Sequence, residues 1–252
     1  MGGLTMRDDL ALTELASASD IGRVRSDNQD LDLLAPPLIA VADGMGGHKG
    51  GATAARMAVD SLREVGTTTD PAALLGALKQ ANTAIAAAAV ADPDLEGMGT
   101  TTTAGFVDAG VLYLVHVGDS RAYLVRDGRI VQVTDDHSIV AEMVRRGALS
   151  EADAERHPAR HVITRALGVD ADVEVDALRV DLEPGDVVLL CTDGLSGPVD
   201  DDEILAAIDG AGTLNEAAAT LIALANDAGG PDNVTVVLAR VDAVTREAAA
   251  AG

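Results

Sequence analysis

The spacing of apolar residues changes along the chain from a helical period to a period of two. Residues 51–65 have apolar positions at helical spacing, and residues 71–91 begin with proline and are rich in Ala and Leu. Both stretches are predicted helices, with Asp70 as the N-cap of the second. Residues 101–133 alternate instead and contain Asp-Ala-Gly, Gly-Asp-Ser and Asp-Gly, which predicts successive strands joined by tight turns.

The other periodic stretches lie on both sides of this block of strands. Residues 10–19 alternate as a strand does, and residues 33–42 end in a short apolar run that predicts a buried strand with Asp43 at its end. Because strands and helices do not alternate strictly, the pattern indicates an α+β domain of layered, largely antiparallel sheets. Further strands are predicted at 186–194 and 232–241, and further helices at 137–147, 201–209 and 214–227.

The chain is expected to hold one domain, over residues 10–241. Its length of 252 residues suits a single domain with a sizeable core. Residues 1–9 are expected to form a leader, and residues 242–252 a disordered tail. Residues 148–172 are polar and contain Pro158, which makes them the candidate for a mobile surface segment.

The composition excludes several classes of function. With 41 acidic and 18 basic residues, the net charge of −23 predicts a surface that repels nucleic acid and anionic membranes. The single cysteine, Cys191, excludes an internal disulfide and is expected to pack in the core. The chain starts without a signal-peptide pattern, and its most apolar window, residues 84–91, is far short of the roughly 20 residues that span a bilayer. A cytoplasmic protein without a membrane segment is therefore expected.

Four aspartates mark the ends of the clearest strands. Asp43, Asp119 and Asp193 follow or end strands, and Asp232 precedes the last one. Strand ends of sandwiched sheets gather at one edge, where these carboxylates would meet. A carboxylate at the end of a buried strand is costly unless it is paired or bound to a metal. Carboxylate, carbonyl and water oxygens suit Mg²⁺ and Mn²⁺, and the bare backbone at Gly44 would bring a carbonyl close to such an ion.

The glycine-rich segment "VADGMGGHKGG" (41–51) raises a competing hypothesis, a nucleotide site. Starting at Gly44, the sixth position of a dinucleotide fingerprint is Lys49 rather than glycine, although a looser variant that ends at Gly50 survives. The phosphate loop of nucleotide hydrolases also fails, because Lys49 is followed by glycine rather than Ser or Thr. A nucleotide-binding oxidoreductase remains an alternative that nicotinamide binding would reveal.

Five ordered motifs resemble the metal-dependent protein phosphatases of type 2C, the PPM family, and its bacterial Ser/Thr phosphatase branch. They are "SDIGRVRSDNQD" (19–30), "VADGMGGH" (41–48), "VGDSRAYL" (117–124), "LLCTDGLS" (189–196) and "GGPDNVTVV" (229–237). The resemblance covers roughly residues 10–241 and implies a central β-sandwich of two mainly antiparallel sheets, flanked by helices in four layers, with a metal centre at one edge.

The resemblance assigns the metal ligands residue by residue. Asp43 would bridge two Mn²⁺ or Mg²⁺ ions, and the carbonyl of Gly44 would add a ligand to one of them. Asp193 and Asp232 would complete the other. Asp119, together with Asp193, would hold a third and weaker ion.

The resemblance also assigns the groups around the ions. Arg25 would bind the substrate phosphate, for which a guanidinium fork is suited, and Asp30 would contact metal-bound water. Gln29 stands where the family often has glutamate and can still hydrogen-bond such a water. Asn233 would orient the neighbouring aspartate.

The sequence offers more than one candidate for the general acid. The eukaryotic form of the family has a histidine where this chain has Met45, which cannot protonate a leaving alkoxide. His48 is a candidate replacement, a loop or helix-cap role for it is an equal alternative, and a metal-bound water could serve instead. The other histidines have no ligand spacing to one another and are expected to be scattered surface or strand residues: His116, His137, His157 and His161. The last two lie in the segment that matches the family's flap, at about residues 145–172.

The sequence therefore predicts a phosphatase that acts on phosphoserine and phosphothreonine in proteins. A metal-bridging water would attack phosphorus directly, without a phosphoenzyme intermediate. The substrates would be phosphorylated proteins, targets of a Ser/Thr kinase. The alternative within the same fold is a catalytically weak or inactive binding module, although Arg25 and the metal aspartates favour activity.

Overall fold

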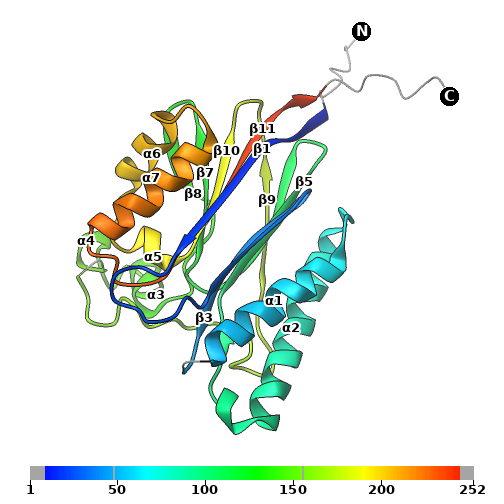
Figure 1. Ribbon diagram of the computed structural model, residues 1–252, viewed down its shortest axis with the longest axis vertical. Coiled ribbons are helices and arrows are strands. Elements are labelled where there is room, and N and C mark those ends of the chain that lie inside the picture. The colour runs from blue at the N-terminus through cyan, green and yellow to red at the C-terminus, as the bar shows by residue number, and fades with distance from the viewer. Residues whose placement is uncertain (1–8, 48, 155, 245–252) are drawn as a thin grey trace, which may run out of the picture.

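The computed structural model describes residues 9–47, 49–154 and 156–244, and its core is two antiparallel sheets packed face to face (Figure 1). The five-stranded sheet has the order β1 (Asp9–Asp20), β11 (Val234–Val244), β10 (Val187–Cys191), β7 (Arg121–Arg126) and β8 (Arg129–Gln132). The six-stranded sheet has the order β2 (Asp30–Ala35), β3 (Leu38–Met45), β5 (Thr102–Asp108), β6 (Val111–Val117) and β9 (Asp176–Asp181), and β4 (Gly99–Thr100) pairs with the end of β3.

Helices cover the outer face of each sheet, which makes four layers in all. The pair α1 (Gly50–Val65) and α2 (Pro71–Ala91) packs on the six-stranded sheet, and α6 (Asp201–Asp209) and α7 (Leu214–Asp227) pack on the five-stranded sheet. The predicted α+β class with two largely antiparallel sheets is thereby confirmed. Short helices lie in the connections: α3 (Ile139–Arg145), α4 (Glu151–Ala154), α5 (Asp193–Ser196) and the 3₁₀ turn η1 (Pro93–Leu95).

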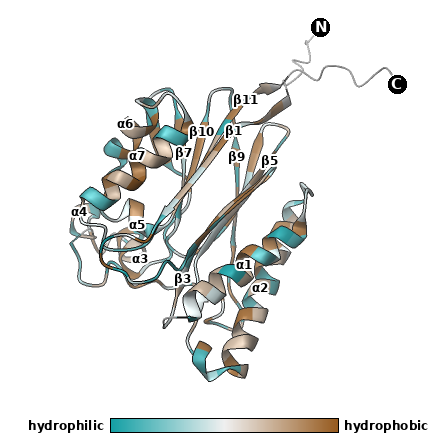
Figure 2. Cartoon of the chain, in the orientation of Figure 1, coloured by the Kyte–Doolittle hydropathy of each residue, from teal (hydrophilic) through white to brown (hydrophobic). Residues whose placement is uncertain are grey.

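Strand β3 shows how the sequence builds the layers. Ile39 and Val41 face the other sheet, whereas Leu38, Ala40 and Ala42 face the helices, and all five are buried. A strand that is buried on both faces has no polar alternation, which is why its sequence is a continuous apolar run. The strands are accordingly coloured mostly as hydrophobic in Figure 2, while the helices mix both colours.

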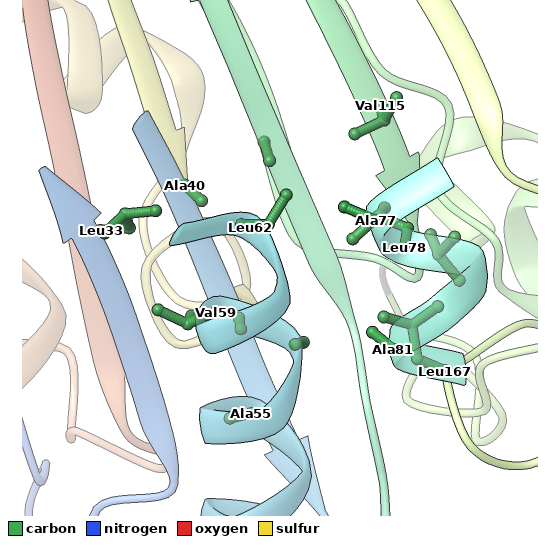
Figure 3. Packing of buried hydrophobic residues seen from close by; sticks show 14 of the residues in the cluster. Leu33, Ala40, Ala55, Val59, Leu62, Ala77, Leu78, Ala81, Val115 and Leu167 are labelled. Carbon is green, nitrogen blue, oxygen red and sulfur yellow. The ribbon is translucent and has the colours of Figure 1, made fainter. Parts of the chain in front are cut away.

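Aliphatic side chains fill the space between α1, α2 and the six-stranded sheet (Figure 3). Val59 and Leu62 of α1 lie beside Leu33 and Ala40 of the sheet, and Leu78 of α2 joins the same cluster. This cluster matters to the site because it fixes the position of α1, whose first turn lies against the end of β3.

Helix α2 is long and apolar enough to cross a membrane by length and composition alone. In the structure one face of this helix packs in the domain core, with Leu74, Leu78 and Ile85 buried. Asp70 caps its N-terminus as predicted, because its carboxylate accepts a hydrogen bond from the backbone N–H of Ala72 at 2.9 Å.

The structure differs from the predicted elements in several places. The strand predicted at 186–194 ends at Cys191, and Asp193 begins the short helix α5 instead of ending a strand. β3 continues through Asp43 to Met45, so this aspartate lies within the strand rather than at its end. β9 was not predicted, because its residues alternate only between half-buried and exposed and follow a polar segment. The predicted tail from Asp242 is wrong at its start, since β11 pairs with β1 through Val244. Residues 1–8 and 245–252 lie outside the described residues.

Candidate active site

A pocket of about 900 Å³ opens at one end of the sandwich, where β3 and β10 finish. Three of the predicted metal aspartates line it: Asp43, Asp193 and Asp232. Arg25 and the glycine loop that begins at Gly44 form other parts of the wall. The structure therefore brings together residues from four distant parts of the sequence, as the motifs predicted.

The backbone of Asp43 is held on both sides by two neighbouring threonines. Its N–H donates to the Oγ1 of Thr101 at 3.2 Å, and its carbonyl accepts from the N–H of Thr101 and the hydroxyl of Thr100, both at 2.9 Å. These bonds leave the carboxylate free to face the pocket. The side chain is therefore carried by a rigid strand rather than by a flexible loop.

Gly44 and Gly51 allow the end of β3 to touch the start of α1. A Cβ on Gly44 would overlap the carbonyl of Gly51 and would press on that of Gln29, and a Cβ on Gly51 would overlap the side chain of Gln29. Gly44 and Gly51 thus serve a close backbone approach beside Asp43. This packing accounts for them without a nucleotide.

Thr192 ties the two sheets together beneath the pocket. Its hydroxyl donates to Oδ2 of Asp30 at 2.8 Å and accepts from the N–H of Thr235 at 3.0 Å. The opposite oxygen of this carboxylate, Asp30 Oδ1, is buried and has no hydrogen-bond partner, and the same is true of Asp193 Oδ1. Unpartnered buried carboxylate oxygens are uncommon and are the type of donor that a hard divalent cation takes.

Burial and mutual repulsion raise the pKa values of the aspartates at this site. Burial raises the pKa of Asp30 to about 7, and the charges of Asp193 and Asp232 oppose its ionisation further. Burial likewise raises the pKa of Asp119 to about 8, with Asp193 as the main charged neighbour. The pKa of Asp43 rises well above its ordinary value for the same reasons. A nearby cation would reverse these effects, so the donor set fits Mn²⁺ or Mg²⁺.

Among the described residues, no three Asp, Glu, His or Cys side chains form a metal cage by themselves. An ion in this pocket would therefore also need carbonyl and water ligands. Mg²⁺ is commonly coordinated in this way, because it keeps several water ligands and binds only one or two carboxylates.

Arg25 contacts Asp232 directly. Its Nη2 donates to Oδ2 of Asp232 at 2.6 Å, and Oδ1 of the same carboxylate accepts from the N–H of Asn233 at 2.8 Å. The Arg25 side chain is still 55% exposed, so its guanidinium also faces the solvent of the pocket. The predicted phosphate ligand and a predicted metal ligand thus lie next to each other.

Asn233 holds the loop that carries Arg25. Its Oδ1 accepts from the N–H of Gln29, and its Nδ2 donates to the carbonyls of Ile21 and Asp27, all at 2.9 Å. Asn233 orients Asp232 only through the backbone N–H described above. The side-chain amide of Gln29 donates to the carbonyl of Gly47 at 3.3 Å and so supports the glycine loop.

Asp119 occupies the turn between β6 and β7, beside the pocket rather than in its wall. Gly118 precedes it at φ +112°, and a Cβ on Gly118 would overlap the side chain of Thr101. The hydroxyls of Thr101 and Ser120 are 2.7 Å apart, which connects this turn to the strand end that carries Asp43.

The histidines depart most from the sequence prediction. His161, expected to be a scattered residue, lines the pocket together with its neighbour Arg160. His116 and His137 are buried, with ring centroids 4.7 Å apart. The signal for His161 was its place in the polar segment that resembles the family's flap. His48 lies outside the described residues, so its suggested role stays a prediction, while Met45 lines the pocket as expected for its position.

Comparisons with known proteins identify the family of the chain. A family model described as protein phosphatase 2C matches residues 22–229. Over 230 residues the chain is 44% identical to the serine/threonine protein phosphatase PstP of Mycobacterium tuberculosis, and it covers 44% of that relative's length. It is 38% identical to the serine/threonine phosphatase stp of Listeria monocytogenes, with 89% of this chain and 94% of the relative covered.

Solved structures give the same result. The crystal structure of the M. tuberculosis phosphatase PstP superposes with a TM-score of 0.86 at 42% identity, over 93% of this chain and 99% of that chain. A second structure, of the PstP catalytic domain in complex with two manganese ions, has a TM-score of 0.84 at 42% identity and the same coverage. The fold is thus the two-sheet sandwich of these solved phosphatases. The chain belongs to the protein phosphatase 2C family, and the resemblance inferred from the five motifs is confirmed.

Proposed function

We propose that this protein is a metal-dependent phosphatase that hydrolyses phosphoserine and phosphothreonine in proteins. The observation that carries the proposal is the pair of buried, unpartnered oxygens of Asp30 and Asp193 next to a pocket that Asp43 and Arg25 line. The names of the relatives, serine/threonine phosphatases, support the substrate class. The two manganese ions in the PstP structure support the choice of metal.

Four groups would hold the two core ions: the carboxylates of Asp43, Asp193 and Asp232 and the carbonyl of Gly44. Asp119 would serve a third and weaker ion with Asp193. Bound Mn²⁺ or Mg²⁺ supplies an acidified water and neutralises phosphate charge. All the groups in these assignments are oxygen donors, which is the donor type that both cations prefer.

The residues of the chain bind and orient the reactants. The guanidinium of Arg25 reaches the pocket from an exposed loop, and its planar fork is suited to two oxygens of a phosphate. Asp30 has one oxygen held by Thr192 and leaves Oδ1 free to accept a hydrogen bond from water. Asn233 and Gln29 keep the loops on both sides in place.

The substrates are phosphorylated proteins that a Ser/Thr kinase modifies, in the cytoplasm. The strongly acidic net charge and the single buried cysteine, Cys191, are compatible with that setting.

The experiment that tests the activity is phosphate release from phosphothreonine and phosphoserine peptides in Mn²⁺, with a phosphotyrosine peptide as control. Release from the first two that stops on chelation supports the proposal. A folded protein that releases no phosphate in Mn²⁺ supports instead the inactive binding module of the same fold.

A further inference from the structure

His137 occupies a position that links two segments of the site. Its backbone N–H donates to the carbonyl of Gly118 at 2.8 Å, and the N–H of Gly118 donates to its Nδ1 at 3.0 Å. The residue is only 2% exposed. The buried ring therefore contacts the turn that carries Asp119 from the protein interior.

The same residue also holds the segment that forms part of the pocket wall. The carbonyl of His137 accepts from the N–H of Thr164 at 2.7 Å, and the N–H of Ile139 donates to the carbonyl of Val162 at 2.9 Å. These bonds form a short antiparallel bridge. The bridge begins directly after Arg160 and His161. These two residues and Ile163 line the pocket.

The far edge of the ring completes the link. Because Nδ1 accepts from Gly118, the ring proton belongs on Nε2, which lies 3.3 Å from Oδ2 of Asp176. Nη1 of Arg165, in the same wall segment, donates to Oδ1 of Asp176 at 2.9 Å, so the carboxylate of Asp176 faces both the ring and the guanidinium. The 3.1 Å between Nη1 of Arg165 and Nε2 joins two donors, and the charge of Asp176 offsets their repulsion. Burial and the Arg165 charge lower the pKa of His137, in agreement with a neutral ring.

We propose that His137 is a positioning residue: its rigid ring couples the Asp119 turn to the wall segment 159–165, so that neither moves without the other. The inference rests on the proposed function only for its effect on catalysis. Displacement of the ring would shift Arg160 and His161 relative to the carboxylates and would weaken substrate binding more than the chemical step.

Two substitutions separate the halves of this link. His137→Asn keeps an acceptor near the Nδ1 position and loses the contact with Asp176. His137→Gln keeps a donor near the Nε2 position and loses the acceptor for Gly118. The matched control is Thr134→Val, since Thr134 Oγ1 also accepts from one buried backbone N–H, that of Ala122, at 3.0 Å.

Amide hydrogen exchange of the full chain, measured in segments 117–121 and 159–167, tests the proposal. Either histidine variant is expected to speed exchange about tenfold in both segments, the size of one lost hydrogen bond, while Thr134→Val leaves 159–167 unchanged. If His137→Asn speeds only 159–167 and His137→Gln only 117–121, the two halves are independent and the proposal is wrong. Equal effects of Thr134→Val on both segments would also overturn it.

A kinetic measurement separates this inference from the proposed function. With p-nitrophenyl phosphate and Mn²⁺, both histidine variants are expected to raise KM about fivefold or more while kcat changes less than about twofold. A fall in kcat of about fivefold or more, with KM unchanged, would contradict a positioning role. Absence of turnover in the wild-type protein would refute the proposed function and leave the exchange result to decide the inference.

Discussion

The guanidinium of Arg25 and the carboxylate of Asp232 are in direct contact at 2.6 Å, although the motifs assign one to phosphate and the other to metal. Contact between these groups means that a phosphate bound by Arg25 would lie next to any ion that Asp232 would hold. Hydrolysis requires this proximity, because the phosphate must meet both a cation and an activated water. The loop of Arg25 is fixed by Asn233, the residue that follows Asp232 in the chain.

Replacement of Arg25 by lysine tests the fork geometry. A lysine at this position would keep the charge but lose the planar pair of donors, so kcat/KM is expected to fall about tenfold, and that of Arg25→Ala about a hundredfold. Steady-state kinetics with p-nitrophenyl phosphate measure both. Activity of Arg25→Ala close to that of the wild type would show that Arg25 only neutralises Asp232.

Stability without metal should fall as the pH rises. The pKa of Asp30 is raised to about 7 and that of Asp119 to about 8, both by burial, so the native state binds their protons more tightly than the unfolded chain does. Their contribution is complete below about pH 4, near the pKa of an unfolded Asp, and is lost as the pH rises through about 7 to 8. Urea unfolding in a chelator should show this decline between about pH 5 and pH 8.

Two controls can be included in this series of unfolding measurements at different pH. Addition of Mn²⁺ should restore stability at the alkaline end, because a bound cation stabilises the ionised carboxylates. Asp30→Asn should make the dependence shallower. Stability that rises with pH over the same range in the chelator would refute the account of these carboxyl groups.

Gly44 and Gly47 form a matched pair for the close approach beside the metal centre. A Cβ on Gly44 meets the carbonyls of Gly51 and Gln29, whereas a Cβ on Gly47 meets nothing within 4 Å. Gly44→Ala is expected to lower the free energy of unfolding by about 1–3 kcal/mol and to weaken Mn²⁺ binding, whereas Gly47→Ala changes neither. Chemical unfolding and calorimetry measure the two effects, and equal results for both variants would contradict the packing described here.

Asp119 should matter less than the core aspartates. Because it lies beside the pocket, Asp119→Asn is expected to raise the Mn²⁺ concentration needed for half-maximal activity and to leave activity at saturating Mn²⁺ within about tenfold of the wild type. A metal titration of turnover checks this. A loss at saturation as large as that of a core aspartate variant would place Asp119 in the core site.

The sequence was sufficient for most of the fold because its signals are local. The periods of residues 51–65 and 71–91, the cap at Asp70 and the turns between strands each depend on neighbouring residues. β9 was not predicted because an edge strand with alternate exposed positions has too few apolar residues to be recognised from the sequence. Its pairing partner β6 lies far earlier in the chain, and only the folded sheet shows the pairing.

The site was harder to predict because its contacts are long-range. The sequence placed the aspartates only near the ends of strands, and the contact between Thr192 and Asp30 crosses 162 residues. The wall role of His161 and the buried link through His137 depend on how a polar segment folds back, and no periodicity encodes that. Sequence spacing alone therefore suggested scattered histidines, whereas in the structure His161 lines the pocket and His137 is buried between two segments.

Asp193 and its neighbours are proposed to hold the cations that activate water. The most direct measurement is p-nitrophenyl phosphate hydrolysis by the wild type and by Asp193→Ala, with and without Mn²⁺, with circular dichroism to confirm folding. We predict that wild-type turnover requires Mn²⁺ and that Asp193→Ala reduces it more than about a hundredfold. Turnover that is independent of metal, or that survives Asp193→Ala within a few-fold, would contradict the metal centre.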